Sequence, residues 1–532
     1  MLMYTLLSVA LALLQANTSS AFPFNPRESH LLTRTDPEKA RSRIIMTVSD
    51  APNGDLMMCL PYELLDAIFQ YLSPADLCKL AVCCRRWRCA LNQDLWWRPL
   101  CRRNGWEYYY STLTDISKEI PYEPQQTCDG SEVNGKTTFP MDAIVREGNP
   151  TGLPSTCKWK EIYLKARHLE GNLEHNRCHV TTLKVFGDDD LLIHHARQSG
   201  RPHVRCSDGD GDLFTMSFSN GTIKVWDVRK GICERVFWAV LSGRENTVKV
   251  QNGIVVVGCT EGMLRAFSVN SGQELPPMKG HKKMDIQCIF FDGDMVVSQA
   301  VSDDDIRVWT VSDGICRHVL ASPDSESRLK DVDYRGKIVA AIYCDNQLRV
   351  WHARSGRCVH ASKQTDHLQS LKLGYGTVAS LHQAPERTWV VVRSVETGEC
   401  TSIPVDDFEM SVSHLWIHNY FVNGGLFLRA LPHRNYEGVY LTRNCDVKFL
   451  AKFGHLKTVF CFHGNRCVLE DRYDYQNNDY HIYKACTDGL KLLRSANHGK
   501  DQSKSLTVWM DDTKIIFRNL DADMNLFVHH YW

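Results

Sequence analysis

Five strings of the sequence share one pattern of alternating apolar residues that ends in a turn glycine: IKVWDVRKG (223–231), LRAFSVNSG (264–272), IRVWTVSDG (306–314), LRVWHARSG (348–356) and WVVVRSVETG (389–398). Aligned on that glycine, they bring Trp226, Phe267, Trp309, Trp351 and Arg393 into one column, at intervals of 41 or 42 residues. Four short antiparallel strands with tight turns need about forty residues, and a fixed period of that size is typical of propeller blades. The sequence therefore predicts a β-propeller.

Three weaker echoes of the pattern continue to the end of the chain, at Leu441 (LTRNCD), Lys484 (YKACTDG) and His530 (LFVHHYW). They raise the expected number of blades to about eight, with seven as the alternative. The last echo ends inside what would be a third strand, so the fourth strand of that blade has to come from elsewhere. Residues 180–186 or 191–196 are the candidates, and closing the ring would remove an exposed sheet edge.

A second pattern occupies residues 59–106, where the spacing of apolar residues predicts three short helices. Pro61 suits the first position of a helix, and Ser73 is the expected N-cap of the next helix, with Pro74 and Asp76 in its first turn. Three helices this short cannot bury all their apolar side chains. Each large apolar side chain left in water loses about 1.5–3 kcal/mol of burial free energy. An apolar partner surface is implied, and the alternative is a small bundle that packs on the rest of the chain.

The order of residues in this segment resembles the F-box over nearly its full length: LP-x-ELL-x-x-IF-x-YL-x-x-x-DL, then VC-x-x-x-W, then DLWWRPL. Gly280-His281, Gly454-His455 and the dipeptide Trp226-Asp227 resemble WD repeats. The chain is thus similar to the F-box/WD-repeat proteins, which are substrate-recognition subunits of Skp–cullin–F-box ubiquitin ligases. That resemblance implies a non-catalytic role, with the helices docking on a Skp-type adaptor linked to a cullin scaffold and the propeller binding a protein substrate. The adaptor-facing and core positions of the motif fall on Leu60, Pro61, Leu64, Ile68, Leu72, Leu77, Val82, Cys83 and Trp87.

The same resemblance implies a substrate site in the central channel of the propeller. In this family a basic residue that opens the first strand of a blade can bind a phosphorylated or acidic peptide. Those positions are assigned to Arg205, Lys249 and Lys330, with neutral Gln287 and Gln369 in two other blades. The alternative is that these residues are solvated strand ends, which contribute little.

The expected domain organisation follows from these patterns. Residues 1–55 form a tail or signal-like extension, 56–106 the F-box, 107–177 a linker, and 178–532 the WD-repeat propeller. Proline and glycine in 107–156 predict a flexible connection. Within the linker, helical spacing returns near 158–174, with Trp159, Ile162, Tyr163, Ala166 and Leu169 on one face.

Composition narrows the remaining classes. The 62 basic and 62 acidic residues balance, which disfavours a globally basic nucleic-acid binder. The 21 scattered cysteines suit a reducing compartment, so a cytoplasmic or nuclear location is expected. Residues 1–14 resemble the apolar core of a signal peptide but lack a basic start. The alternatives are true secretion or an extension upstream of a start at Met46, Met57 or Met58. No other run is apolar enough to span a membrane.

Motifs for catalysis or cofactor binding are not found in the sequence. Cys233, Cys316, Cys358 and Cys400 recur once per blade, which places them too far apart for a disulfide or a shared metal. The string DGDGD (208–212) begins like a calcium loop but lacks its later glycine and glutamate, so a turn is expected. Neither a metal nor another cofactor is predicted. A non-ligase WD-repeat scaffold and a secreted propeller enzyme remain as alternative functions.

Overall fold

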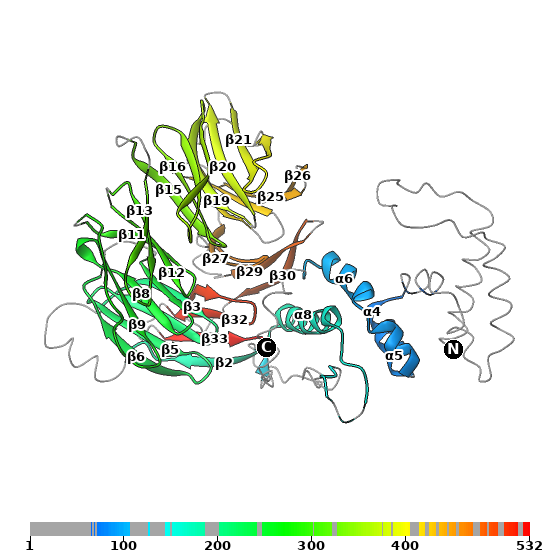
Figure 1. The fold of residues 1–532 in the computed structure, drawn as a ribbon. Helices are drawn as coiled ribbons and strands as arrows, with labels where there is room; N and C mark the ends of the chain where they lie inside the picture. Colours follow the sequence, from blue (N-terminus) through cyan, green and yellow to red (C-terminus); the bar gives the residue numbers. More distant parts are fainter. Residues whose placement is uncertain are drawn as a thin grey trace. The chain divides into compact units, whose positions relative to one another are not determined.

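The computed structural model divides into two compact units (Figure 1). Unit 1 comprises Met1–Thr114 and Pro140–Ala166, and unit 2 comprises Asp115–Phe139 and Arg167–Trp532. Within them the structure describes residues 65, 69, 72–83, 85–106, 126–127, 144–148, 150, 152–186, 202–241, 247–282, 284–301, 303–321, 327–374, 376–384, 387–404, 414–420, 425–431, 436–443, 446–453, 457–471, 479–486, 489–497, 505–519 and 525–532. The tail 1–55 and most of 107–156 lie outside this set. No helix among the described residues is both long and apolar enough to cross a membrane.

Unit 1 contains the helices α4 (Pro74–Cys83), α5 (Arg85–Leu91) and α6 (Asp94–Arg103). Aromatic side chains form their core, because Phe69 lies edge-on to Trp87 and Trp96 with ring centroids 5.8 and 4.9 Å apart. The indole N–H of Trp97 donates to the carbonyl of Leu91 at 2.7 Å, which satisfies a polar group that is fully buried. Helices are thus found where the sequence predicts them from Pro74 onward, while the helix predicted to begin at Pro61 lies outside the described residues except for Leu65 and Phe69.

The helix predicted in the linker is found as α8 (Lys158–Glu174). Its first half belongs to unit 1, where the backbone N–H of Trp159 donates to Asp94 at 3.2 Å. The ring of Tyr163 packs against Trp97 and Trp106, with both centroid distances at 5.2 Å.

The second half of α8 belongs to unit 2 and packs on the propeller. Glu170 forms an ion pair with Lys484, and both side chains are almost completely buried. The side-chain amide of Asn172 donates to the carbonyl of Tyr531 at 2.8 Å. A buried ion pair loses several kcal/mol if one partner is removed, so these contacts fix where this half of the helix lies on unit 2.

The rest of unit 2 is the predicted propeller, and its described strands form eight sheets, here called blades 1 to 8. Blade 1 contains β3 (Val204–Asp210), β4 (Leu213–Phe218), β5 (Thr222–Asp227) and β6 (Ile232–Trp238), and blade 2 contains β7 (Val248–Gln251), β8 (Ile254–Gly258), β9 (Met263–Ser268) and β10 (Met278–Lys279). Blade 3 contains β11 (Ile286–Phe291), β12 (Met295–Ala300), β13 (Ile306–Thr310) and β14 (Cys316–Leu320), and blade 4 contains β15 (Leu329–Arg335), β16 (Ile338–Tyr343), β17 (Gln347–His352) and β18 (Arg357–Lys363). Blade 5 contains β19 (His367–Leu373), β20 (Thr377–Ala384), β21 (Arg387–Ser394) and β22 (Cys400–Pro404), and blade 6 contains β23 (His414–Tyr420), β24 (Gly425–Leu431), β25 (Tyr436–Arg443) and β26 (Asp446–Phe453). Blade 7 contains β27 (Lys457–His463), β28 (Arg466–Asp471), β29 (Asp479–Cys486) and β30 (Gly489–Asn497), and blade 8 contains β31 (Ser505–Met510), β32 (Lys514–Asn519), β33 (Leu526–His530), β2 (Arg177–Leu183) and β1 (Gln126–Thr127).

The repeated strings of the sequence lie on the third strand of each blade, from β5 in blade 1 to β33 in blade 8. In the first, third and fourth blades the tryptophan of the string pairs directly with the recurring cysteine of the fourth strand, as in Trp226 with Cys233. Arg393 pairs with Cys400 in the same way, which confirms the alignment of the fifth string. These four cysteines are free thiols on separate blades.

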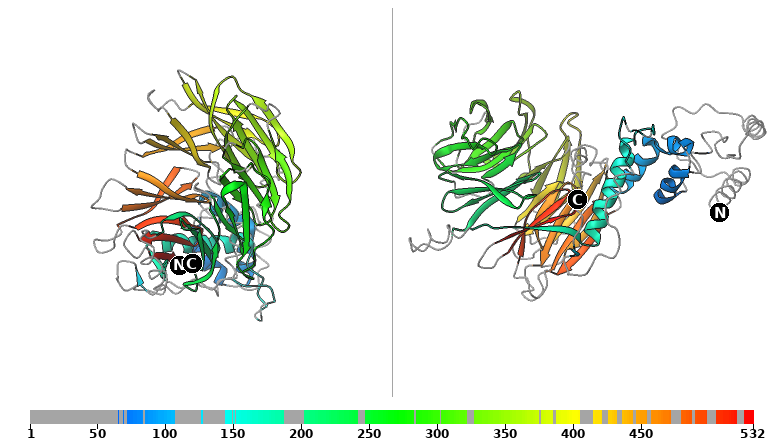
Figure 2. Two further views of the ribbon diagram at one scale, coloured as in Figure 1. Left: turned by 90° about the vertical axis from the view of Figure 1, so that its left-hand side faces the viewer. Right: turned by 90° about the horizontal axis from the view of Figure 1, so that it is seen from below.

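Blade 8 closes the ring with strands from both ends of unit 2. The strand β2 pairs antiparallel with β33, from His179 opposite His530 to Leu183 opposite Leu526, and Figure 1 shows the two side by side. The first of the two predicted closing segments, 180–186, is therefore the one that pairs, while 191–196 lies outside the described residues. In Figure 2 the strand colours run from green through yellow and orange to red around the propeller.

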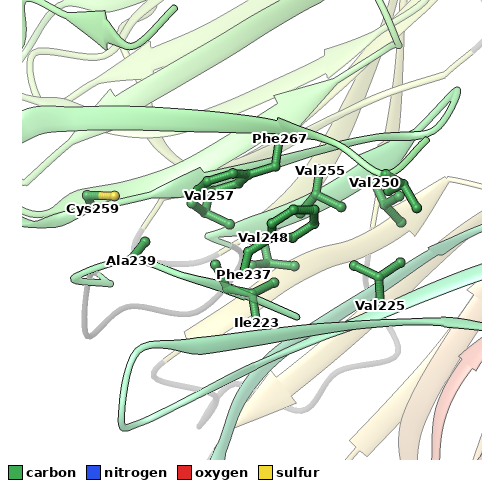
Figure 3. Packing of buried hydrophobic residues seen from close by; sticks show 11 residues of the cluster. Ile223, Val225, Phe237, Ala239, Val248, Val250, Val255, Val257, Cys259 and Phe267 are labelled. Atoms are coloured by element: carbon green, nitrogen blue, oxygen red, sulfur yellow. The ribbon is translucent and has the colours of Figure 1, made fainter. Parts of the chain in front are cut away.

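Apolar contacts between neighbouring blades make up the core. Between blades 1 and 2, Phe237 and Phe267 stack with ring centroids 4.7 Å apart, and valines such as Val225 and Val255 surround them (Figure 3). Burying each of these side chains is worth about 1.5–3 kcal/mol. The period-2 pattern of the strands thus places one apolar face of each blade against the next.

A hydrogen-bonded network of four side chains fixes blade 3. The imidazole of His281 bonds to Asp303 at 2.7 Å through Nδ1 and to Ser298 at 2.8 Å through Nε2. The indole N–H of Trp309 donates to the same Ser298 hydroxyl at 2.8 Å. The Gly280-His281 signal of the sequence thus marks a real structural element, while Gly454-His455 lies outside the described residues.

Candidate functional site

The F-box-like helices begin as the sequence predicts. The Ser73 hydroxyl accepts the backbone N–H of Asp76 at 3.2 Å, which makes Ser73 the N-cap of α4. The hydrogen bond from the Ser73 hydroxyl lowers the pKa of Asp76 below its ordinary value. The carboxylate is thereby kept ionised at the positive end of the helix dipole.

The predicted adaptor-binding residues fall into three groups. Leu77 and Trp87 are buried within unit 1, with exposed fractions of 3% and 7%, so they occupy core positions. Val82 on α4 is 77% exposed, as expected of a side chain that needs a partner, and Leu72 is half-buried. The backbone of Cys83 ends α4. The remaining four, Leu60, Pro61, Leu64 and Ile68, lie outside the described residues, as does the side chain of Cys83.

A further exposed apolar residue of unit 1 escaped the sequence analysis. Leu95, in the first turn of α6, is 54% exposed, although Trp96 and Trp97, which follow it, are buried. Its position one residue before Trp96-Trp97 puts it on the opposite side of the helix from the aromatic core. Val82 and Leu95 together give unit 1 two large apolar side chains in water.

In the propeller, the positions assigned to substrate binding lie on the first strands. These strands contact one another from blade to blade and so form the innermost layer of the ring. Near its start, almost every first strand carries a β-bulge, a residue that has no opposite partner on the second strand. The bulged residues are Arg205, Gln287, Lys330, Gln369 with Ser370, His418, Phe460 and Val508. Bulges re-aim side chains and are common beside binding sites, so these residues are called the bulge ring.

Lys249 does not belong to the bulge ring, which corrects its alignment with Arg205 and Lys330. It pairs with Val256 in regular register. Through that pairing it lies level with the residue before Phe267 on the third strand, and in blade 4 the residue at the same level is Asp333. The cause is the spacing in the sequence: Leu241 bridges Cys259 and Val248 pairs with Val257, so six residues separate Leu241 from Val248, whereas the other blades have only one or two extra residues at a bulge.

The two basic members of the bulge ring differ in their surroundings. The amine of Lys330 donates to the carbonyl of Leu368 at 2.5 Å and lies 3.3 Å from Nε2 of His367. Burial lowers the pKa of Lys330 below its ordinary value. Arg205 is half-buried, and no side-chain hydrogen bond or ion pair joins it to another described residue. The structure therefore brings Arg205 and Lys330 to equivalent positions and sets Lys249 apart.

The sequence analysis missed carboxylates on the first strands that line the channel wall and join neighbouring blades. Asp208 and Asp210 of blade 1 accept the backbone N–H groups of Val250 and Asn252 in blade 2, at 2.9 and 2.7 Å. Asp331 and Asp333 of blade 4 accept those of Leu371 and Leu373 in blade 5, at 2.9 and 2.8 Å. The inner edge of a first strand has no strand partner, so these acids satisfy donors that would otherwise be unpaired. In the sequence, the alternating aspartates of SDGD (207–210) and KDVD (330–333) could have indicated these residues.

Lysines of the following blade stand close to these carboxylates. The amine of Lys249 lies 3.5 Å from Asp208, and that of Lys372 lies 3.9 Å from Asp333. Burial raises the pKa of Asp208 and of Asp331, and the nearby lysine in each case opposes that rise. Lys249 thus has a structural partner in the channel wall. No group of three metal-ligating side chains occurs among the described residues.

Comparison with known proteins supports both parts of this architecture. A family model described as F-box-like matches residues 57–103. An F-box-like segment followed by a propeller defines the F-box/WD-repeat class, and the resemblance drawn from the sequence is confirmed.

Three relatives carry names of that class or of its complexes. The chain is 27% identical over 206 residues to F-box/WD repeat-containing protein 7 of Drosophila melanogaster, which covers 38% of this chain and 12% of that protein. It is 22% identical over 196 residues to the probable E3 ubiquitin ligase complex SCF subunit sconB of Arthroderma benhamiae, covering 35% and 25% of the two chains. For the sconB protein of Neosartorya fischeri the identity is 23% over 221 residues, covering 36% and 32%. The match thus spans a third or less of the length of each relative. Among solved structures, the computationally designed Ika8 protein overlays with a TM-score of 0.45 at 18% identity, covering 63% of this chain and 98% of that one.

Proposed function

We propose that this protein is the substrate-recognition subunit of a Skp–cullin–F-box type ubiquitin ligase. The observation that carries the proposal is the combination in one chain of F-box-like helices with exposed Val82 and Leu95 and a closed propeller. The relatives named as SCF subunits support it. In such a complex the chain contributes no acid, base or nucleophile, and it accelerates ubiquitin transfer by positioning the substrate.

The helices of unit 1 are the proposed contact with the Skp-type adaptor, which links the chain to a cullin. Leu60, Pro61, Leu64, Ile68, Leu72, Val82 and Cys83 are the proposed surface, with Leu77 and Trp87 beneath it. The protein substrate is proposed to bind at the bulge ring. Arg205 and Lys330 there give the site a preference for acidic or phosphorylated peptides, because a guanidinium holds such groups in bidentate fashion.

The experiment that tests the ligase role is co-purification with an Skp–cullin pair. We expect Leu64→Asp or Val82→Asp to abolish adaptor binding while the propeller still folds, because a carboxylate placed in an apolar contact has no partner. Val319→Asp is the matched control: Val319 is 47% exposed on β14 of the propeller. Adaptor binding that survives both unit 1 substitutions at wild-type strength would favour a WD-repeat scaffold without ligase function.

A ligase role also implies a location in the cell, and we propose that the protein is in the cytoplasm or the nucleus. Sequencing the N-terminal residue of the mature protein tests this. A start near residue 17 or 22 would instead indicate cleavage of residues 1–14 as part of a signal peptide.

A further inference from the structure

The first half of α8 brings a lysine against the core of unit 1 without giving it a counter-ion. Lys160 is only 7% exposed, and its amine lies 5.3 Å from the centre of the Trp97 ring on α6. No hydrogen bond or ion pair to this amine occurs within the described part of the chain. Lys165, the other buried lysine of this half of α8, differs because its amine pairs with Glu161. Lys160 is thus a cation, nine-tenths buried, whose charge no described carboxylate neutralises.

The groups around Lys160 do not supply a negative charge. Cys78 of α4 and Cys157, the residue directly before α8, are close enough to the amine to act on its pKa. Burial raises the pKa of Cys157 to about 12 and also raises the pKa of Cys78, so both thiols are neutral at physiological pH. Burial lowers the pKa of Lys160, and the nearby guanidinium of Arg88 on α5 acts in the same direction. A buried cation without a counter-ion costs free energy, which a carboxylate brought to the amine would recover.

The amine of Lys160 is within reach of a binding partner. It is not one of the described polar atoms that are completely buried and lack a hydrogen bond, so the tip of the side chain meets solvent while its methylene stem is covered. Cys78, whose thiol acts on this amine, lies four residues before Val82 on α4, and the two therefore share one face of that helix. Val82 is 77% exposed and belongs to the proposed adaptor surface. The Lys160 amine thus lies next to that surface.

The helices that carry the proposed adaptor surface are strongly basic. Residues 74–103 contain seven lysines and arginines but only two aspartates, although the whole chain is neutral. Both aspartates have partners, since Asp76 accepts the hydroxyl of Ser73 and Asp94 accepts the backbone N–H of Trp159. An apolar surface with a basic border fits a partner whose own apolar contact residues are bordered by carboxylates.

From these observations we propose that Lys160 takes part in the adaptor contact and receives a carboxylate of the Skp-type adaptor beside the apolar surface of unit 1. The inference rests on the proposed function and deepens it, because it gives the adaptor contact a charged anchor outside the F-box-like helices. The Trp97 ring holds the amine in place, and Arg88 adds a second positive charge nearby. The carboxylate also fixes the orientation of the adaptor, which apolar contacts at Val82 and Leu95 do not specify by themselves.

Equilibrium binding of a recombinant Skp-type adaptor to the full-length chain tests the proposal. Lys160→Met keeps the length of the side chain and its packing on Trp97 but removes the charge. We expect adaptor binding to weaken about tenfold or more, as for the loss of a hydrogen bond between charged groups. The unfolding temperature should stay the same or rise, because the substitution removes a buried charge that has no partner in the chain. Lys165→Met is the matched control: it removes an already paired lysine from the same helix, and it should bind the adaptor as the wild type does.

A double-mutant cycle identifies the partner group and keeps the test decisive if Lys160→Met does not fold. Each aspartate and glutamate of the adaptor is changed in turn to asparagine or glutamine, and Lys160→Gln is measured beside Lys160→Met. One adaptor variant should bind the wild-type chain about tenfold more weakly than the unchanged adaptor does. The same adaptor variant should bind the Lys160 variants no more weakly than the unchanged adaptor binds them, because the interaction is already lost.

The outcomes separate this inference from the proposed function. If the wild-type chain does not bind the adaptor, the proposed function is overturned and the inference with it. If the wild-type chain binds and a folded Lys160 variant binds equally well, only the inference is overturned. A lower unfolding temperature together with weaker binding in both Lys160 variants also overturns it, since Lys160 would then stabilise unit 1. Displacement of the adaptor by a short single-stranded RNA would assign the basic helices to nucleic acid and would contradict the proposal.

Discussion

At the scale of single residues, the sequence identified the aromatic column and the recurring cysteines, because a fixed period needs no knowledge of the fold. It could not identify the partners of His281. His281 precedes β11, Ser298 lies on β12 and Asp303 lies between β12 and β13, and only the folded blade brings the three side chains together. Burial lowers the pKa of His281, so at neutral pH the network holds a neutral imidazole whose tautomer its two partners select.

Buried histidines make stability depend on pH in a defined window. Burial lowers the pKa of His530 to about 3 and that of His382 to about 4. In the unfolded chain both titrate near their ordinary value of about 6.5. Below that pH the unfolded state binds protons that the folded state does not, so the free energy of unfolding should fall as the pH drops from about 6.5 towards 4.

Denaturant unfolding at several pH values measures this dependence. His530→Asn should make the free energy of unfolding depend less steeply on pH between about 6.5 and 4, whatever it does to stability at pH 7, because one of the titrating groups is gone. His175→Asn, which changes the exposed histidine directly after α8, serves as the control and should keep the wild-type slope. A wild-type slope in the His530 variant would mean that this histidine does not contribute.

At the scale of elements, strand order could be predicted and strand register could not. Arg205 and Lys330 were correctly assigned to equivalent first-strand positions, since both follow the same spacing from the third-strand tryptophan of their blades. Lys249 was misplaced because six residues separate the bridged Leu241 from the paired Val248, and alternation alone does not reveal this longer spacing. The hydrogen bonds that aspartates of blades 1 and 4 form with the next blade escaped notice for a related reason: the carboxylates accept backbone N–H groups of another repeat.

Reversing the charge of the two basic bulge residues tests the substrate site. In the double variant Arg205→Glu, Lys330→Glu, capture of protein substrates should drop at least about tenfold, because two cations at one site have become anions. Adaptor binding should be unaffected. Pull-down followed by an in vitro ubiquitination assay measures both properties on one preparation.

Lys337→Glu provides the control for that reversal. Lys337 is an exposed lysine in the turn that joins β15 to β16, so its substitution makes the same charge change as Lys330→Glu alone at a position outside the bulge ring. If the doubly reversed chain still captures and ubiquitinates the same partners, the substrate site lies elsewhere on the ring.

At the scale of the whole molecule, the two-part organisation followed from the change in period, from helical spacing to alternation. The sequence pattern did not reveal to which unit each part of the connecting segment belongs. Pro140–Ala166 groups with the helical unit, and only the second half of α8 groups with the propeller. The second half of α8 makes long-range contacts with the propeller, such as the Glu170–Lys484 ion pair, and no local pattern in the sequence reports them.

Limited proteolysis tests the organisation directly. Proline and glycine in residues 107–156 should make that stretch the preferred site of cleavage. Brief digestion should release a stable fragment that begins between about 150 and 180, because the propeller requires β2 from Arg177 onward. Mass spectrometry of the fragments identifies their ends. Cleavage at equal rates throughout 180–532 would argue against a closed ring.

The pairing of β2 with β33 has a consequence for biosynthesis. The contact between Thr181 and His530 joins residues 349 positions apart, so β2 emerges from the ribosome long before its partner exists. At ordinary rates of translation the interval is roughly 20 to 70 seconds. Throughout it, the nascent propeller is an open arc in which the edge of β2 that will meet β33 is unpaired, and such an edge can pair with other chains. The last strand to be made is the one that locks the ring, and a chain that stalls before β33 remains a target for quality control.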